Sequence, residues 1–338
     1  MNRLFFILCI LSFPVVFGCK PSPTPSAICV SWPAQTTLIR ELSDKGALTS
    51  AVAAAHHFYD SINKSCDDTI IKALAAVQLA DAQTWYSLFY RRGFDTAGMY
   101  VAALQRFRIN NDSILARIDN TTGFYYYVIS FANNTNRIDS AVPRLRNAIA
   151  LYTQSGREKE AAYVYFNLGL CFQNNPDTTR NSIDTAELYF RASYALSGKL
   201  DDQRTNSYAT RHLAAVHMDR KQYDSALYYA FRSYESREAV GLQFVQPFSL
   251  LLIGDIFKFT NADSALRYHQ EAAAYADRMN NAAGIAAAYI AVGDDYLAGK
   301  DIARAKRQYE MAAAKTAASG NTDGHETALK KLAELNHH

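Results

Sequence analysis

The chain has 338 residues, of which 49% are hydrophobic and 20% charged, a balance typical of a folded rather than a disordered protein. Its formal net charge of +3 provides no strong attraction to nucleic acid, so no nucleic-acid partner is expected. Glycine (15) and proline (8) are scarce, and this scarcity favours helices over a β-sandwich or a β-barrel.

The first residues predict an export signal. Arg3 precedes a short apolar run that contains Pro14 and ends at Gly18. Such a run is too short to span a membrane and is typical of a secretory signal. We therefore predict a signal peptide over residues 1–18.

The junction "VFGC" at residues 16–19 resembles the bacterial lipoprotein box, in which an apolar, a variable and a small residue precede a cysteine. The resemblance implies that Cys19 is lipidated and that the protein is exported and anchored to a membrane, on the periplasmic face or at the outer membrane of a bacterium. Residues 19–37 then form a flexible linker. A cleaved signal followed by an incidental cysteine is the alternative.

Three further cysteines follow. Cys29 and Cys66 can form a disulfide in an oxidising compartment, and the sequence leaves this pairing open. Cys171, within "NLGLCF", is expected to be a small buried core residue. No cysteine or histidine spacing predicts a metal site.

A motif of an apolar residue, aspartate, a hydroxyl residue and alanine recurs along the chain. The copies are "FDTA", "IDSA", "IDTA", "YDSA", "ADSA" and the degenerate "IARA", and they end at Ala97, Ala141, Ala186, Ala226, Ala265 and Ala305. A degenerate further copy, "YDSI", is found at residues 59–62. A recurrence about every 40 residues is the signature of a stacked helical array.

Small residues precede these alanines. Leu168-Gly169, Ile253-Gly254 and Val292-Gly293 each have an aromatic residue three positions later, and in the remaining copies we place Leu213-Ala214 and Val128-Ile129 at the same point. Six copies in register resemble the tetratricopeptide repeat (TPR), as found in bacterial TPR-containing lipoproteins. HEAT-type repeats share the period and are the alternative.

The resemblance implies an all-α, right-handed α-solenoid of antiparallel helix pairs. It implies about six to seven repeats over residues 38–320 and a C-terminal capping helix over residues 321–338. The small residues let paired helices approach closely, and the structural positions are Ala97, Ala141, Gly169, Ala186, Ala226, Gly254, Ala265, Gly293 and Ala305.

The motif aspartates are predicted to be N-caps of the second helix of each pair. In "IDTAEL", Glu187 is predicted to complete a capping box with Asp184. These carboxylates are therefore assigned to architecture rather than to acid–base catalysis.

No catalytic motif is present, so no catalytic residue, cofactor or metal is assigned. Adjacent histidines on a helix point about 100° apart, so His56 and His57 are expected on the surface or in packing rather than at a metal. His337 and His338 are expected to form a frayed end. The protein is therefore predicted not to be an enzyme.

In TPR proteins the first helix of each pair lines a concave groove. Carried over position by position, the resemblance implies a groove for a protein or an extended peptide. The predicted groove residues are Tyr126, Asn133, Tyr163, Phe166, Gln173, Tyr208, Arg211, Met218, Phe248, Asp255, Lys258 and Asp294, with Ser130 and Leu297 beside them. Tyr126, Phe166 and Arg211 stand where some members carry a lysine and asparagine clamp, which disfavours the acidic C-terminal peptides that this clamp binds.

The sequence is therefore interpreted as a non-enzymatic, membrane-anchored protein-interaction scaffold. Two alternatives remain open: a sensory or regulatory array that works with a separate signalling partner, and a glycan-capturing surface lipoprotein. Starch-utilisation binding proteins, which the last alternative resembles, are markedly longer.

Overall fold

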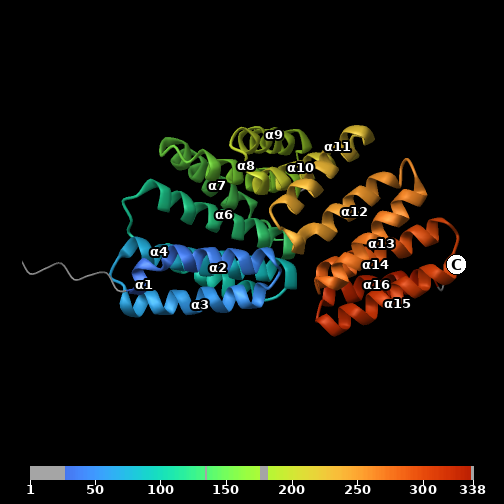
Figure 1. Ribbon diagram of the computed structural model, residues 1–338, viewed down its shortest axis with the longest axis horizontal. Coiled ribbons are helices and arrows are strands. Elements are labelled where there is room, and N and C mark those ends of the chain that lie inside the picture. The colour runs from blue at the N-terminus through green and yellow to red at the C-terminus, as the bar shows by residue number, and fades with distance from the viewer. Residues whose placement is uncertain (1–26, 134, 176–181, 336–338) are drawn as a thin grey trace, which may run out of the picture.

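The computed structural model describes residues 27–133, 135–175 and 182–335, and within these ranges all regular structure is helical (Figure 1). This confirms the predicted all-α class. The predicted signal peptide, Cys19 and the terminal pair His337-His338 lie outside the described residues. None of the described helices is both long enough and apolar enough to cross a bilayer.

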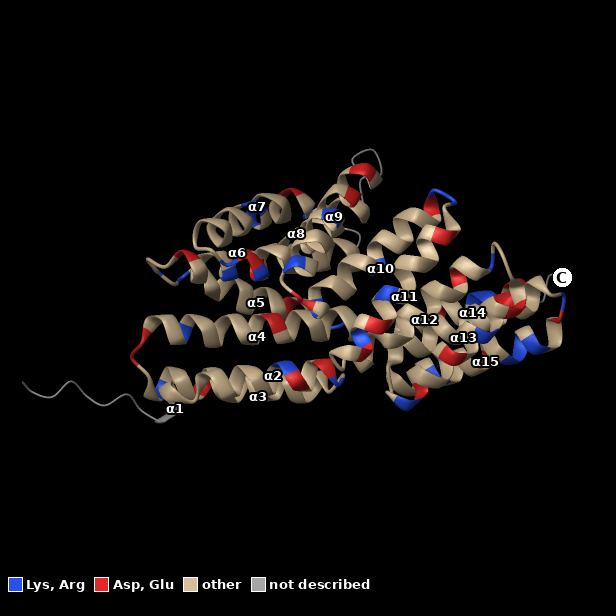
Figure 2. Cartoon of the chain, turned by 45° about the horizontal axis from the view of Figure 1, so that its top comes forward, with Lys and Arg blue, Asp and Glu red and all other residues tan. Residues whose placement is uncertain are grey.

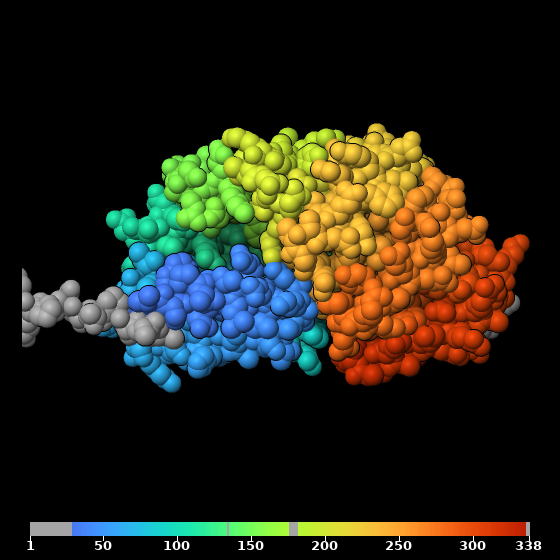
Figure 3. All heavy atoms as spheres, viewed as in Figure 1, coloured from blue at the N-terminus to red at the C-terminus, as the bar shows by residue number. Residues whose placement is uncertain are grey.

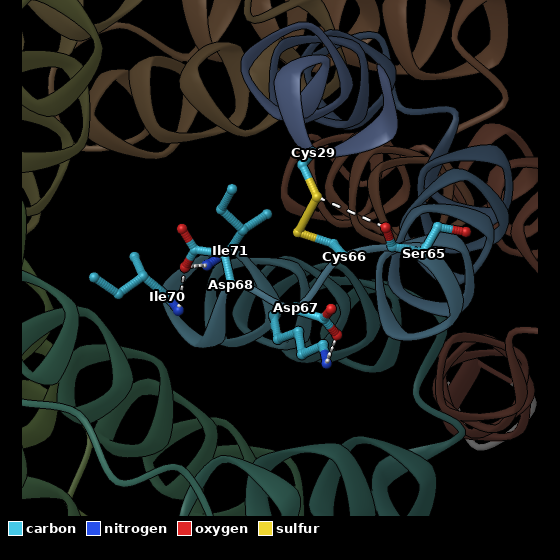
Figure 4. Close-up of a disulfide and its surroundings, with 8 residues drawn as sticks. Cys29, Ser65, Cys66, Asp67, Asp68, Ile70 and Ile71 are labelled. Carbon is cyan, nitrogen blue, oxygen red and sulfur yellow. Dashed lines mark hydrogen bonds and ion pairs between the residues drawn. A yellow bond between two sulfur atoms is a disulfide. The ribbon is translucent and has the colours of Figure 1, made fainter. Parts of the chain in front are cut away.

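The N-terminal helices are α1 (Ala27–Val30), α2 (Trp32–Asp44) and α3 (Leu48–Ser65). The second half of the segment expected as a flexible linker is therefore helical. Cys29 of α1 forms a disulfide with Cys66 at the end of α3 (Figure 4), which resolves the pairing that the sequence left open. Asp68 accepts hydrogen bonds from the Ile70 and Ile71 amides and so caps the next helix (Figure 4).

Antiparallel helix pairs follow, and each helix contacts the next along the chain. In order the pairs are α4 (Thr69–Tyr90) and α5 (Phe94–Leu104), α6 (Asp112–Asn133) and α7 (Ile138–Gln154), α8 (Glu158–Gln173) and α9 (Ile183–Lys199), α10 (Gln203–Asp219) and α11 (Tyr223–Ala239), α12 (Gln246–Phe257) and α13 (Ala262–Arg278), and α14 (Ala282–Ala298) and α15 (Ile302–Ser319). The 3-10 turn η1 (Gln243–Val245) precedes α12, and the final helix α16 (Thr322–Leu335) follows α15. This is the predicted α-solenoid.

The motif aspartates are not N-caps, contrary to the prediction. Asp184 and Asp224 are the second residues of α9 and α11. Two of these helices are capped by the polar residue before the motif: the Ser182 side chain accepts from the Thr185 amide, and Asn261 caps α13 in the same way, whereas α7 and α11 have no side-chain cap. A carboxylate within the first turn still stabilises a helix through the macrodipole, which explains the recurrence of aspartate.

The predicted capping box of Glu187 is also absent. This residue lies further inside α9, where its carboxylate contacts Arg191 at 2.7 Å and Arg220 at 2.5 Å. Asp184 also pairs with Arg220, at 2.6 Å. The acidic residues of this motif copy therefore hold α9 to the end of α10 instead of capping a helix.

The six motif alanines are all buried, and glycines mark the tightest crossings between paired helices. A Cβ at Gly169 would lie within 3 Å of the Phe190 ring, and Gly254 and Gly293 face His269 and Tyr309 in the same way. In α6 the glycine at this crossing is Gly123, which faces Leu145. The Val128-Ile129 pair placed there from the sequence is wrong, because Gly123 lies 18 residues before Ala141, whereas Gly293 lies only 12 before Ala305.

The "YDSI" copy at residues 59–62 does not begin a second helix. It lies in the last turns of α3, where Ile62 is buried. The N-terminal helices therefore do not follow the repeat pattern.

The N-terminal helices meet the C-terminal half of the array. Helix α4 contacts α14, and Arg91 at the end of α4 pairs with Asp323 of α16 at 2.7 Å. Gly46, at φ +76°, lies against the Phe244 ring, where a side chain would collide. Figure 3 shows the blue N-terminal atoms reaching the orange C-terminal ones, with a hollow between the blue helices and the green and yellow middle repeats. The array thus curves until its two halves enclose the concave side.

Candidate binding channel

Three adjoining cavities occupy the concave side of the array. The polar cavity has a volume of about 480 Å³, the aromatic cavity about 520 Å³ and the small cavity about 310 Å³. Trp85, Phe89 and Tyr208 line both the polar and the aromatic cavity, and Arg211 and Phe248 line both the aromatic and the small cavity. The shared walls make the three cavities parts of one channel, which we call the channel below.

The first helices of the pairs line the channel in a common register. The lining side chains are the sixth and third residues before each crossing residue: Arg117 and Asn120, Tyr163 and Phe166, Tyr208 and Arg211, Phe248 and Leu251, Ala287 and Ile290. Residues three apart lie on the same face of a helix, so each helix presents one stripe to the channel.

The structure brings eight of the twelve predicted groove residues to the channel. They are Tyr163, Phe166, Tyr208, Arg211, Phe248, Asp255, Lys258 and Asp294.

The other four predicted groove residues do not line the channel. Asn133 is exposed at the end of α6, Tyr126 and Met218 pack against the hydrophobic clusters, and Gln173 holds His212 through a 2.5 Å hydrogen bond. The misplacement of Tyr126 and Asn133 follows from the wrong crossing residue in α6, because Arg117 and Asn120 stand in the true register. The two residues predicted beside the groove are also elsewhere. Ser130 is buried and its hydroxyl donates a hydrogen bond to the Tyr126 carbonyl, and Leu297 packs against a hydrophobic core cluster.

Several channel residues were not predicted. Trp85 and Phe89 belong to α4, where the repeat pattern is weakest, and Tyr127 and Phe131 follow from the corrected register of α6. Arg237 lies near the end of α11, a second helix, so the rule that first helices line the groove could not identify it.

The aromatic cavity is lined by rings that contact one another from different helices. The Trp85 and Phe124 centroids are 5.1 Å apart, those of Phe166 and Tyr208 are 5.3 Å apart, and the Phe89 ring meets Phe248 at 6.1 Å. Offset and edge contacts of this kind make a rigid apolar wall. This wall suits apolar side chains of a ligand.

The polar cavity carries the charged groups of the channel. Burial raises the pKa of Asp81 despite the nearby charge of Arg117 and the hydrogen bond from Thr121 (2.7 Å). Arg204 donates to both carboxylate oxygens of Asp44, which ties α10 to α2 along one edge of this cavity. Acidic and basic side chains both line the polar cavity. Figure 2 shows the same mixture of charges along the helices of the described chain.

Positive charge dominates the junction of the aromatic and small cavities. Burial, together with the charges of Arg211 and Arg237, lowers the pKa of His212 well below its usual value. Burial and the charge of Arg211 lower the pKa of Arg237 to about 9, which leaves this guanidinium charged at neutral pH. The imidazole of His212 is therefore neutral between two charged guanidinium groups.

No protein-family model matches the sequence, and no curated protein matches it. Solved structures do match. A Rap protein complexed with Competence and Sporulation Factor superposes with a TM-score of 0.66 at 10% identity, over 91% of this chain and 85% of the other. NprR in complex with its cognate peptide NprX gives 0.53 at 15% identity, over 86% and 82% of the two chains.

A signal-transduction ATPase with a tetratricopeptide repeat sensor, from Pyrococcus horikoshii, gives a TM-score of 0.55 at 13% identity. That match covers 84% of this chain and 42% of the ATPase. Identities this low establish the fold and not the function. The chain therefore has the α-solenoid fold of tetratricopeptide-repeat proteins, as the small-residue pattern predicted.

Proposed function

We propose that this protein is a non-enzymatic scaffold that binds an extended peptide, or an extended loop of a partner protein, in the channel. The observation that carries the proposal is the continuity of the three cavities, whose walls alternate between aromatic, amide and charged side chains. An extended chain places successive side chains into such alternating surroundings, while amide and charged groups bond its backbone. The peptide bound in the similar NprR structure supports the same use of this fold.

The proposal includes export and membrane attachment through lipidated Cys19. The Cys29–Cys66 disulfide supports an oxidising compartment, because disulfides persist mainly in exported proteins. The lipoprotein box at residues 16–19 supports the anchor itself. The protein then presents its channel to partners outside the cytoplasm.

A selection of peptides from a randomised library tests the binding function. Phe131 lines the aromatic cavity and is 49% exposed, whereas Phe259 lies outside the channel and is 60% exposed. We expect enriched peptides whose affinity falls by about tenfold in Phe131→Ala, as for a buried aromatic anchor. Phe259→Ala is the matched control and should leave affinity unchanged. Failure to enrich any peptide, or equal effects of the two substitutions, would contradict the proposal.

A further inference from the structure

Two guanidinium groups at the aromatic cavity have no carboxylate partner. The Arg211 guanidinium makes no hydrogen bond and no ion pair with any residue that the structure describes, and it is only partly buried. Arg237 is 3% exposed, and within the described chain its Nε has no hydrogen-bond partner. Its Nη1 donates only to neutral acceptors, the Val245 carbonyl and the Ser249 hydroxyl, both at 2.8 Å.

The other polar groups of the aromatic cavity are already engaged. Arg91 donates a hydrogen bond to Asp323, so the carboxylate that lines this cavity already has a charged partner. His212 bonds Gln173, and Asn321 bonds the Ala282 carbonyl. The unmatched charge of the cavity is therefore the positive charge of the two guanidinium groups.

The acid that interacts electrostatically with Arg211 is bonded to other groups. Asp255 shares the small cavity with Arg211, but its carboxylate lies 3.0 Å from Lys258 and 3.5 Å from the buried ring of His269. A charged guanidinium that faces an apolar cavity without a counter-ion is costly, and a ligand carboxylate removes that cost. The charge therefore specifies an anionic group on whatever fills this cavity.

We propose that the aromatic cavity binds the C-terminal residue of a peptide, with the terminal carboxylate on Arg211 and the last side chain against the aromatic wall. The inference rests on the proposed peptide-binding function and names which end of the peptide enters this cavity. A terminal residue carries its carboxylate and an apolar side chain on the same Cα, so it matches a guanidinium set among aromatic rings. An internal Asp or Glu would place only the acid there and leave the rings unfilled. Arg237, which lies behind the wall with its guanidinium 5.8 Å from the Tyr208 ring centroid, adds positive potential to the same cavity.

This arrangement differs from the lysine and asparagine clamp that the sequence lacks. The clamp binds acidic C-terminal peptides, whereas Arg211 lies in a mainly apolar cavity. The expected ligand is therefore a peptide with an apolar C-terminal residue and a free carboxylate.

Calorimetric titration of three synthetic peptides tests the inference. The probes are acetyl-Leu-Leu-Phe with a free carboxylate, the same peptide as its C-terminal amide, and acetyl-Leu-Asp-Phe as the amide. We expect the free acid to bind about tenfold more tightly than the first amide, since the charge-assisted bond is lost in the amide.

Two substitutions of the same type test whether Arg211 causes the preference for the free acid over the amide. Arg211→Gln removes the charge in the cavity and should abolish the preference for the acid. Arg220→Gln removes a charge at the C-cap of the same helix, where Arg220 pairs with Asp184 and Glu187 outside the cavity, and should preserve the preference. Thermal unfolding of both variants establishes that each is folded.

Each remaining outcome overturns the inference in a distinct way. Equal binding of the acid and both amides refutes the carboxylate site while the channel remains a peptide site. Tight binding of the Asp-containing amide assigns the carboxylate to a side chain instead of the C-terminus. Binding of none of the three also refutes the inference, and the library selection then decides separately whether the channel binds peptides.

Discussion

The Nδ1 atom of His269 lies 2.6 Å from a carboxylate oxygen of Asp295, although the His269 side chain is completely buried. On the other side of the ring, Nε2 lies 3.5 Å from Asp255. Burial alone would lower the pKa of His269, but the hydrogen bonds to Asp255 and Asp295 outweigh burial and raise it. The His269 ring therefore links α13 to both α12 and α14.

This pair predicts a pH window for stability. The pKa of His269 is raised in the folded protein, so its contribution is complete below about pH 6.5 and is lost as the pH rises through the raised value. Burial acts to raise the pKa of Asp255, but bonds to His269 and Lys258 hold it below its usual value, so its contribution is present above about pH 4 and is lost on acidification.

We therefore expect His269→Gln to flatten the loss of stability above about pH 6.5, relative to the unsubstituted protein. Urea denaturation midpoints across a pH series measure this difference. Identical slopes in the two proteins would show that His269 is not the group responsible.

Gly293 illustrates how closely paired helices approach. A Cβ at Gly293 would lie within 3 Å of the Tyr309 ring, which is fully buried and fixed by a 2.6 Å hydrogen bond from its hydroxyl to Asp294. We expect Gly293→Ala to lower the free energy of unfolding by about 2 kcal/mol through overpacking. Gly198 is an exposed glycine in the last turn of α9 with no close neighbour, so Gly198→Ala should raise stability by about 0.5 kcal/mol. Chemical denaturation of the two variants should give opposite signs, and a shared sign would contradict the crossing geometry.

The disulfide predicts that reduction destabilises the N-terminal helices. Cys29 and Cys66 are 37 residues apart in sequence, and cross-linking a loop of this length stabilises a protein by about 3–4 kcal/mol in the chain-entropy model. We expect Cys29→Ser to lower the free energy of unfolding by that amount and to make stability insensitive to dithiothreitol. Cys171 is a free, buried thiol, so Cys171→Ala should keep the sensitivity to dithiothreitol. Equal sensitivity of the protein and Cys29→Ser would refute the stabilising role.

In the proposed function, lipidated Cys19 alone attaches the protein to the membrane. We expect Cys19→Ala to move the protein from the membrane fraction to the soluble fraction of cells, because removal of the lipid leaves no anchor. Cys9→Ala, within the predicted signal peptide, should not change the distribution. Fractionation followed by immunoblotting measures both, and retention of Cys19→Ala on membranes would refute the lipid anchor.

The sequence predicted the second helix of each pair well, because the motif marks its start. Ile138, Ile183 and Tyr223 are the first residues of α7, α9 and α11. The sequence could not tell whether aspartate caps a helix or lies in its first turn, since both positions favour a negative charge. Only the three-dimensional structure identifies the N-cap residues, such as Ser182 of α9 and Asn261 of α13.

The sequence also set the channel register where a Leu-Gly or Leu-Ala pair marks the crossing, although Gly169 lies 17 residues before Ala186 and Ala214 only 12 before Ala226. Tyr163, Phe166, Tyr208 and Arg211 line the channel for this reason. The register failed in α6, because the crossing was placed 12 residues before Ala141, as for Ala214 and Ala226, whereas Gly123 lies 18 residues before it.

By itself, the sequence determined the helical array and the stripe that most first helices present, because periodic small and apolar residues act through contacts between neighbouring helices. Only the tertiary structure decided what closes the channel and what charge it carries. The contact of Gly46 with Phe244, the pairing of Asp44 with Arg204 and the pairing of Arg91 with Asp323 each join segments that repeat-to-repeat spacing does not relate. Such contacts depend on how far the whole array curves, which is the sum of many small rotations between adjacent helix pairs.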